Sequence, residues 1–300
     1  MIGVIILNYK NWKVTIECVA SIMESKFSED IYILLIDNGS KNESVDRLEA
    51  AFHNNKMVHI IKLPENLGFA KGNNIGIKKC KEKGITYCLL VNSDVILKKD
   101  TISLLYVEML RHKDAVIIGP GVKGEDNQRM PSSRLSSVRI IDALEIGRWI
   151  KTKSLNEDEV LECTRVYSVS GCCFLIDINK FIELPAFDEA TFLYNEENIL
   201  GALVERSNYS IYIYPRAEVI HKHAASSGGG RNDFVSIEYI KSSLYYYKTY
   251  QNMGKGIALV MVIIYFIKMA MLSLKYKCLH PYHILKVSIQ EWRGLYGKGE

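Results

Sequence analysis

The sequence predicts an α/β fold with a mostly parallel sheet, followed by a helical C-terminal extension. Over residues 1–120, short runs rich in β-branched residues alternate with stretches of helical periodicity, which is the pattern of a doubly wound parallel sheet. Polar residues directly follow several of the apolar runs. Because ligands bind beyond the carboxyl ends of parallel strands, these residues predict a binding site.

The elements of the first half follow from these runs. Each expected strand is a short apolar, β-branched run: Ile2–Leu7, Ile31–Ile36, Val58–Leu63, Tyr87–Val91 and Val116–Gly119. Each expected helix lies between two such runs: Trp12–Glu24, Ser44–His53, Asn73–Lys83 and Asp100–His112. Pro120-Gly121 is typical of a turn and should close this half.

The second half is less regular. Residues 121–165 are polar and give no clear pattern. Strands are expected near Val166–Ile176 and Ser210–Tyr214, on either side of a helix at Glu196–Ser207. His221 ends a further strand-like run, and three consecutive glycines at 228–230 give the following loop much backbone freedom.

Charge and cysteine content argue against some classes of protein. From Ser236 onward the chain has nine Lys and Arg and three Glu, a net charge of +6. Because the whole chain carries +4, the part before Ser236 carries about −2. A basic tail on a slightly acidic body favours an anionic partner for the tail. Nucleic-acid binding is not expected, because the body is not basic and the lysines of the tail alternate with apolar runs. The seven cysteines form no C-x-x-C pair, which argues against a disulfide scaffold and a zinc site and favours a reducing compartment. We also expect no signal peptide.

Two aspartates at strand ends are candidates for chemistry. Asp94, in Asn92-Ser93-Asp94, follows a buried run, and a carboxylate in such a place must be paired, solvated or bound to a metal. The alternative is a cap on the following helix or turn. Asp37 begins Asp37-Asn38-Gly39-Ser40, which could bind a ligand, form an Asx-turn, or do both.

Several segments together resemble the family 2 glycosyltransferases of the GT-A fold, nearest to the bacterial rhamnosyltransferase-like group. They occur in the order Ile5–Tyr9, Asp37–Ser40, Asn66–Gly76, Asn92–Val95, Phe187–Glu189, Phe192–Glu197 and His221. The resemblance spans roughly residues 2–230. It implies an inverting transfer from a UDP- or dTDP-sugar, with rhamnose as one candidate. The acceptor would be a saccharide or lipid-linked saccharide in surface polysaccharide synthesis, and the usual cofactor is Mg²⁺ or Mn²⁺.

The resemblance implies roles for the carboxylates. Asp94 would bind the cation that neutralises the leaving diphosphate, with His221 as a second metal ligand. The family's D-x-D motif keeps only one carboxylate in this chain, because Asn92 replaces the first. Glu197 would be the general base toward the acceptor hydroxyl, with Glu196 in a supporting role. Adjacent glutamates could instead simply stabilise a helix N-terminus, and His221 could be structural.

The family pattern also suggests residues that contact the donor or acceptor. These are Asn8, Tyr9, Asp37, Asn66, Gly68, Lys71, Asn73, Asn74, Asn92, Gly171 and Arg231. Either Asn73 or Asn74 could start a helix that points at an anion, whereas Lys71 and Arg231 could equally face solvent. The family usually has Asp at 197, and an Asp–Arg pair where Ile199 and Leu203 stand. These departures leave open a non-catalytic sugar-binding or scaffold protein. A nucleotidyltransferase is a weaker alternative, because a glycine-rich loop near the first strand is missing.

The tail predicts a link to membranes. The run Ile257–Leu274 is interrupted by Lys268, flanked by lysines and preceded by several tyrosines. These features favour a helix that lies on anionic lipid. A buried helix or a homodimer contact is the second interpretation, and a spanning helix the third. We therefore expect a catalytic domain at 1–235, a membrane-associated segment at 236–300, and a cytoplasmic protein peripheral at the inner face of the cell membrane.

Overall fold

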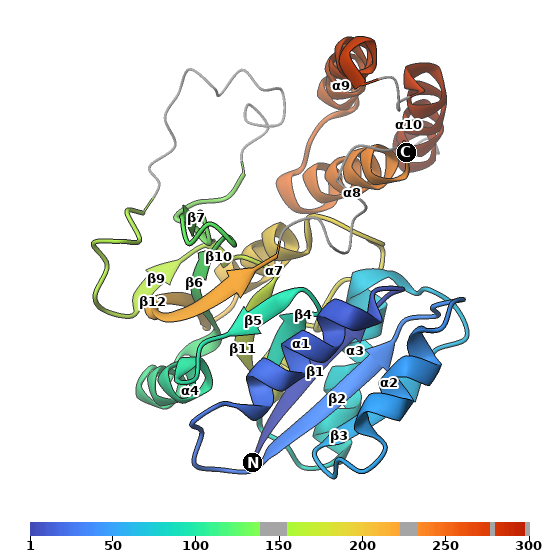
Figure 1. Cartoon of the computed structure of the whole chain (residues 1–300). Coiled ribbons are helices and arrows are strands. Elements are labelled where there is room, and N and C mark those ends of the chain that lie inside the picture. Colours follow the sequence, from blue (N-terminus) through green and yellow to red (C-terminus); the bar gives the residue numbers. More distant parts are fainter. Residues whose placement is uncertain (139–154, 223–232, 277–279, 298–300) are drawn as a thin grey trace.

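The structure is a computed structural model that describes residues 1–138, 155–222, 233–276 and 280–297 (Figure 1). Arg231, one of the predicted ligand-binding residues, and the glycines at 228–230 lie outside the described residues.

A mixed sheet forms the centre of the α/β domain, in the strand order β3-β2-β1-β4-β11-β6-β12-β5. These strands are β1 (Ile2–Asn8), β2 (Ile31–Asp37), β3 (Val58–Lys62), β4 (Tyr87–Asn92), β5 (Val95–Leu97), β6 (Ala115–Lys123), β11 (Cys173–Asp177) and β12 (Ser210–His221). The first four strands pair in parallel, as do β6 and β12, whereas β11 lies antiparallel between β4 and β6. The predicted α/β, mostly parallel architecture is confirmed.

Short strands extend this sheet. They are β7 (Arg129–Met130), which pairs with β6, and β9 (Thr164–Val166), which pairs with β12, while β8 (Ser133–Arg134) and β10 (Ser168–Val169) form a separate pair. The expected strand Val166–Ile176 is thus divided into β9, β10 and β11.

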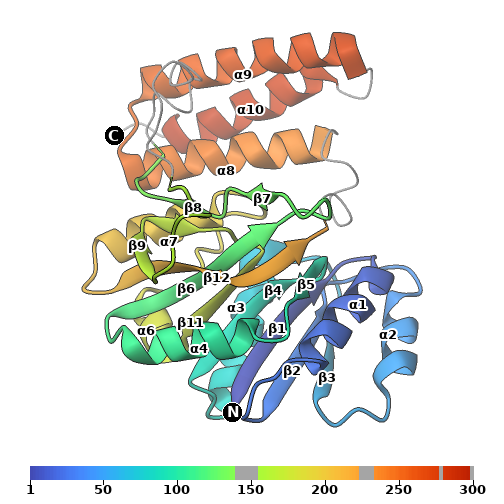
Figure 2. The same cartoon turned by 60° about the vertical axis from the view of Figure 1, so that its left-hand side comes forward.

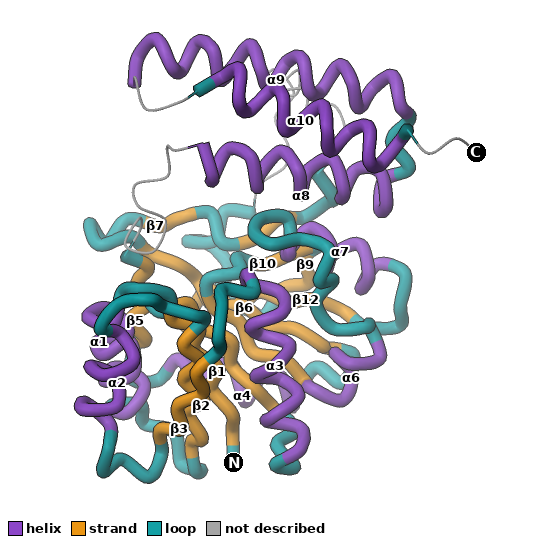
Figure 3. The backbone as a smooth tube through the Cα atoms, turned by 90° about the vertical axis from the view of Figure 1, so that its right-hand side faces the viewer, coloured by secondary structure: helices purple, strands orange, loops and turns teal. Residues whose placement is uncertain are grey.

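Helices cover both faces of the sheet (Figures 1 and 3). On one face lie α1 (Trp12–Met23), α2 (Ser44–Phe52) and α4 (Thr101–Arg111), and on the other α3 (Gly68–Glu82), α6 (Ile178–Glu183) and α7 (Glu196–Glu205). Alternate residues of one strand serve the two cores: Val4 and Ile6 pack with the first set, and Ile5 with the second. Because both faces are covered, the strands are almost continuously apolar.

The expected turn at Pro120-Gly121 is wrong, because β6 runs through both residues to Lys123. The neighbouring β12 has an irregular register opposite this point, between Tyr214 and Glu218. A Cβ on Gly121 would lie 2.8 Å from the carbonyl oxygen of Pro215. The glycine therefore permits close approach of the two backbones within the sheet and does not end the strand.

Three helices form the C-terminal part of the chain: α8 (Asp233–Gln251), α9 (Lys255–Tyr276) and α10 (Pro281–Tyr296). They form a separate layer over the α/β domain, with α8 next to the domain and α9 farthest from it (Figures 2 and 3). Ile199 and Ala202 of α7 share a core with residues of α8, α9 and α10. The helical character of the extension follows the sequence prediction.

The tyrosines before the apolar run do not form a solvent-facing belt, as the membrane argument assumed. Tyr246 and Tyr247 are buried against α7, and the hydroxyls of Tyr245 and Tyr250 donate hydrogen bonds to Asp188. Tyr239 is exposed. Most of these rings therefore attach α8 to the α/β domain.

Candidate functional site

The carboxyl ends of β1 and β2 carry a buried polar pair. Asn8 and Asp37 occupy paired positions, and Asn8 Nδ2 donates a 2.7 Å hydrogen bond to Asp37 Oδ2. Thr15 on α1 fixes the other end of the amide, since its hydroxyl donates to Asn8 Oδ1 at 2.7 Å. The backbone N–H of Ser40 donates to Asp37 Oδ1 at 2.9 Å. This bond reaches three residues along the chain, one residue farther than in an Asx-turn, and it helps to hold the Asp37 carboxylate at the end of β2.

The segment Asn66–Gly68 is fixed by an amide network. Asn38 Nδ2 donates to Asn66 Oδ1, which also accepts from the Gly68 N–H, both at 2.9 Å. Gly68 has a φ of +81°, and a Cβ there would lie 2.5 Å from the carbonyl oxygen of Phe192. Only glycine fits this close approach. The predicted residues Asn66 and Gly68 therefore position the loop against the 192–197 segment.

The idea that Asn73 or Asn74 begins a helix is wrong, because α3 begins at Gly68 and both residues lie inside it. Asn73 Nδ2 donates to the Phe69 carbonyl, one turn earlier in the helix. Asn74 Nδ2 donates to the Phe187 carbonyl and accepts from the Phe187 N–H, so its amide attaches α3 to the segment before α7. Lys71 is exposed on the first turn of α3, and its role stays a prediction.

Tyr9 and Asn92 lie at the ends of neighbouring strands. Tyr9 is partly exposed, and Lys10 Nζ lies 4.8 Å from the centre of its ring. Asn92 ends β4, where its N–H donates to the Cys172 carbonyl at 2.8 Å. No described contact tests their proposed roles in substrate binding.

Asp94 and His221 meet beside the end of β4. The turn between β4 and β5 places Asp94 with only 1% of its surface exposed, and β12 ends at His221, which pairs with Val95 of β5. His221 Nε2 lies 3.2 Å from Asp94 Oδ1. Two ligands of one Mg²⁺ or Mn²⁺ ion, each at about 2.1 Å, would lie about 3 Å apart. The carboxylate and imidazole therefore have the spacing of neighbouring ligands and could hold one divalent cation.

Glu197 lies on the first turn of α7, next to the end of β4. Its Oε1 accepts a 2.9 Å hydrogen bond from the Gly171 N–H. Cys172 directly follows Gly171, and its carbonyl accepts a 2.8 Å hydrogen bond from the Asn92 N–H. Glu197 is therefore placed beside the end of β4, the strand that leads into Asp94. Burial first, and then the charges of Asp94 and Glu197, raise the pKa of the Cys172 thiol to about 12. The structure places His221 beside Asp94 and Gly171 beside Glu197, whereas the roles of these residues stay predictions.

Replacing Gly171 by alanine tests the position of this carboxylate. A Cβ on Gly171 would lie 2.5 Å from Glu197 Oε1, so the carboxylate must move. We expect Gly171→Ala to lower the rate of the sugar transfer expected from the sequence by about 100-fold, because a misplaced catalytic group such as the Glu197 carboxylate usually costs about this much. The measurement is the steady-state rate, with the melting temperature recorded alongside. Gly294→Ala is the control, because nothing lies within 4 Å of a Cβ there. An unchanged rate in a folded Gly171→Ala protein would contradict this placement.

Glu196, next to the proposed base, is a buried carboxyl group. Only 7% of its surface is exposed, and its Oε1 has no hydrogen-bond partner among the described residues. Burial first, and then the charge of Glu197, raise the pKa of Glu196 to about 8. At neutral pH Glu196 is therefore mostly a neutral acid.

This shifted pKa predicts a pH-dependent stability. The unfolded chain ionises Glu196 near 4.5 and the folded chain near 8, so between these values the folded state binds more protons. The free energy of unfolding should then fall as the pH rises from about 4.5 to 8. We expect Glu196→Gln to remove this slope and to raise the free energy of unfolding at pH 8 by about 1–3 kcal/mol. Denaturant unfolding at pH 5 and pH 8 measures the effect, with Glu205→Gln, an exposed position of α7, as the control. An equal change at both pH values would exclude the titration of Glu196 as its cause.

Helix α8 supports the segment before Glu196, which sequence reasoning missed. Tyr194 and Asn195 have φ values of 74° and 67°, a left-handed conformation that costs non-glycine residues energy. Ser243 Oγ accepts from Asn195 Nδ2 at 3.1 Å, and Ser242 Oγ donates to the Leu193 carbonyl. The many serines and tyrosines of α8 were the only sequence feature that could have indicated these contacts. Their partners lie about fifty residues earlier in the chain, so the sequence did not identify them.

Comparison with known proteins shows the family of this chain. A family model described as Glycosyl transferase family 2 matches residues 3–183. Glycosyltransferase GlyG of Streptococcus pneumoniae is 32% identical over 120 residues, which is 40% of this chain and 38% of that protein. An N-acetylglucosaminyl-diphospho-decaprenol L-rhamnosyltransferase of Mycobacterium tuberculosis is 27% identical over 214 residues, or 66% of this chain and 68% of that protein.

Solved structures with GT-A-like folds are similar too. GalNAc-T7 with UDP, GalNAc and Mn²⁺ has a TM-score of 0.62 at 16% identity, over 84% of this chain and 49% of that one. TarS 1–349 of S. aureus, in complex with UDP-GlcNAc, has a TM-score of 0.57 at 13% identity, over 88% of this chain and 71% of that one. At these identities the likeness shows the fold alone.

Proposed function

The chain belongs to glycosyl transferase family 2, and from this premise we propose that it is an inverting glycosyltransferase. It would move one sugar, with rhamnose as a candidate, from a UDP- or dTDP-sugar to a saccharide or lipid-linked saccharide acceptor. The observation that carries the proposal is that hydrogen bonds place Glu197 beside the end of β4, which leads into the Asp94–His221 pair: the Gly171 N–H donates to Glu197, and the carbonyl of the next residue, Cys172, accepts from the Asn92 N–H. The relative from M. tuberculosis is by name an N-acetylglucosaminyl-diphospho-decaprenol L-rhamnosyltransferase, which supports a lipid-linked saccharide acceptor; we propose surface polysaccharide synthesis as the pathway.

The residues divide the work of sugar transfer. Asp37, held by Asn8 and the Ser40 N–H, would accept a hydrogen bond from the base or ribose of the donor. Asp94 and His221 would hold Mg²⁺ or Mn²⁺, which when bound supplies positive charge to the diphosphate oxygens. Glu197, oriented by the Gly171 N–H, would take the proton of the acceptor hydroxyl. Glu196 places a buried neutral carboxyl beside that base.

Analysis of the products tests this proposal. The chain is incubated with sugar nucleotides, Mn²⁺ and saccharide or lipid-linked acceptors, and the products are followed by NMR. We expect a nucleoside diphosphate together with a glycoside of inverted anomeric configuration. Release of pyrophosphate would indicate a nucleotidyltransferase, and retained configuration would contradict the role of Glu197. Donor binding without turnover over a broad acceptor panel would favour the scaffold interpretation.

We also propose that α9 lies on an anionic membrane surface at the cytoplasmic face. Among the described residues, Lys255–Leu274 is a helix long and apolar enough to cross a membrane, and 22% of it is buried within the protein. Val260, Ile263, Ile267 and Met271 are exposed and recur at helical spacing, so they form one outer stripe. The net charge of +6 from residue 236 onward complements anionic lipid. A lipid-linked acceptor would give a transferase reason to lie there.

Vesicle binding tests this surface. Ile263→Glu with Ile267→Glu should lower partitioning to phosphatidylglycerol vesicles at least about tenfold, because two apolar side chains no longer enter the lipid. Leu161→Glu is the control, since Leu161 is an exposed leucine of the α/β domain. Absence of binding by the unchanged chain, or binding that the double variant does not alter, would contradict the proposal. A protein that instead forms dimers through this stripe would show a mass by light scattering that the double variant halves.

A further inference from the structure

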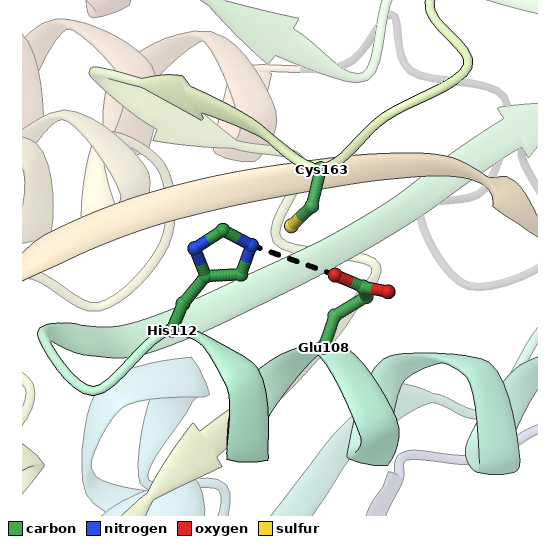
Figure 4. Close-up of side chains that lie close together, drawn as sticks. All are labelled: Glu108, His112 and Cys163. Carbon is green, nitrogen blue, oxygen red and sulfur yellow. Dashed lines mark ion pairs between the residues drawn. The ribbon is translucent and has the colours of Figure 1, made fainter.

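Three potential metal ligands meet at a place apart from the proposed glycosyltransferase site (Figure 4). Glu108 lies on the last turn of α4, His112 follows the helix directly, and Cys163 directly precedes β9. Their ligand atoms all lie within 4.8 Å of one another, and His112 Nε2 lies 3.4 Å from Glu108 Oε2. The spacing of four residues places the first two side chains on one face of the helix end.

This cluster and Asp94 lie toward opposite ends of the parallel strands. His112 lies three residues before the start of β6 at Ala115, and its carbonyl accepts from the Ala115 N–H. β11 runs antiparallel to both β4 and β6, so β4 and β6 point the same way. Asp94 follows the carboxyl end of β4, whereas the cluster lies by the amino end of β6. One ion cannot serve both places.

We propose that Glu108, His112 and Cys163 bind a zinc-class cation at a second site. A thiolate, an imidazole and a carboxylate are the ligands that zinc prefers, with water completing a tetrahedron. Mg²⁺ and Mn²⁺, the ions expected at Asp94, favour oxygen ligands and would not select a cysteine. The lack of a C-x-x-C pair argued against a zinc site. That argument applies to ligands close together in sequence, whereas these three come from two separate segments of the chain.

The surroundings orient each ligand. The His112 ring packs against Tyr212, with ring centres 4.4 Å apart and planes inclined by 30°. The carboxylate of Glu108 is mostly buried, and Arg111 Nη1 donates to its Oε1 at 2.8 Å. The second oxygen, Oε2, remains on the side of His112. Such neighbouring contacts fix the orientation of metal ligands in proteins.

A simple ion pair between Glu108 and His112 is the competing explanation. It accounts for the spacing on α4, but it makes no use of Cys163. Cys163 comes from a separate segment of the chain, yet its Sγ lies within 4.8 Å of the ligand atoms of both other residues, and the ion pair gives no reason for this. A bound ion would connect α4 to the strand β9 and would therefore stabilise the fold. The dependence of binding on Cys163 separates the two explanations.

Cobalt substitution tests the site, because a thiolate bound to Co²⁺ gives a charge-transfer absorption that oxygen and nitrogen ligands do not. The full chain is reduced, stripped with chelator and titrated with Co²⁺, and then with Zn²⁺ in competition. We expect one equivalent of ion with the thiolate band, and a higher melting temperature with zinc. Cys163→Ser should abolish the band, and His112→Gln should weaken binding by about 100-fold, as expected for one ligand of a zinc site.

Two controls make the assignment specific. Cys172→Ser removes a thiol that adjoins the end of β4 and should keep the band, and His53→Gln, at an exposed position of the α/β domain, should bind Co²⁺ unchanged. Absence of a thiolate band in the unaltered chain would overturn the proposal whether or not any variant folds. A band that survives Cys163→Ser, or one lost in Cys172→Ser, would also overturn it. The result does not depend on sugar transfer, so it can fail while the proposed function stands.

Discussion

Glu197→Gln is expected to lower the rate of sugar transfer by about 100- to 10,000-fold, the usual contribution of a general base. The amide keeps the shape of the side chain, and its oxygen can still accept from the Gly171 N–H, as Oε1 does now at 2.9 Å. It cannot take a proton from the acceptor hydroxyl. The turnover number should therefore fall while nucleotide binding and the melting temperature stay close to those of the unaltered chain.

The control for this prediction lies at the other end of the same helix. Glu205 is exposed at the end of α7, so Glu205→Gln makes the same chemical change away from the site and should leave the rate unchanged. A Glu197→Gln protein that transfers sugar at the normal rate would remove Glu197 as the base. Equal losses in both variants would indicate an effect on the helix and not on proton transfer.

Asp94→Asn is expected to abolish activation by Mg²⁺ or Mn²⁺ and to lower the rate by about 100-fold or more, because cation catalysis contributes several kcal/mol. The motif Asn92-Ser93-Asp94 has only one carboxylate. That carboxylate is almost fully buried, and its Oδ1 lies 3.2 Å from His221 Nε2. Asparagine retains the volume but loses the charge that attracts the ion. Titration of nucleoside diphosphate with and without Mn²⁺ measures the binding part of the effect.

Asp100→Asn is the matched control. Asp100 is exposed just before α4, and its side chain makes no capping hydrogen bond. We expect it to leave both metal activation and nucleotide binding unchanged. If Asp94→Asn still binds nucleotide more tightly with Mn²⁺ than without, the ion is held elsewhere and the role of Asp94 is wrong.

The sequence predicted the parts of the fold that local patterns specify. In β1, Val4 and Ile6 pack into the core on one face of the sheet and Ile5 into the core on the other. A strand that is buried on both faces must be apolar along its length, so the apolar run predicts it. The helices between the strands follow from their helical periodicity. The start of α3 was missed by five positions, since Gly68 begins the helix where Asn73 was expected. Glycine has poor helix propensity, and in this helix the approach of Phe192 to Gly68 decides the conformation.

Parts of the site that depend on distant contacts could not be predicted. The strand end at Asp94 and the His221 position were recognisable from short motifs, and the structure brings them together. The burial of Glu196 was not recognisable, because it depends on how α7 packs in the fold. The tyrosines of α8 were interpreted as membrane-facing, yet Tyr245 and Tyr250 bind Asp188. Composition cannot distinguish a tyrosine at a lipid surface from one that bonds to a distant carboxylate.

Metal-dependent release of nucleoside diphosphate from a sugar nucleotide tests the central claim most directly. The purified chain is given a panel of UDP-, dTDP- and GDP-sugars, with Mn²⁺, with Mg²⁺ and with chelator. We predict release from one UDP- or dTDP-sugar, dependent on the cation and lost in Asp94→Asn. Release that is equally fast in chelator would contradict the proposed cation site, and a chain that neither binds nor cleaves any sugar nucleotide would contradict the proposed function.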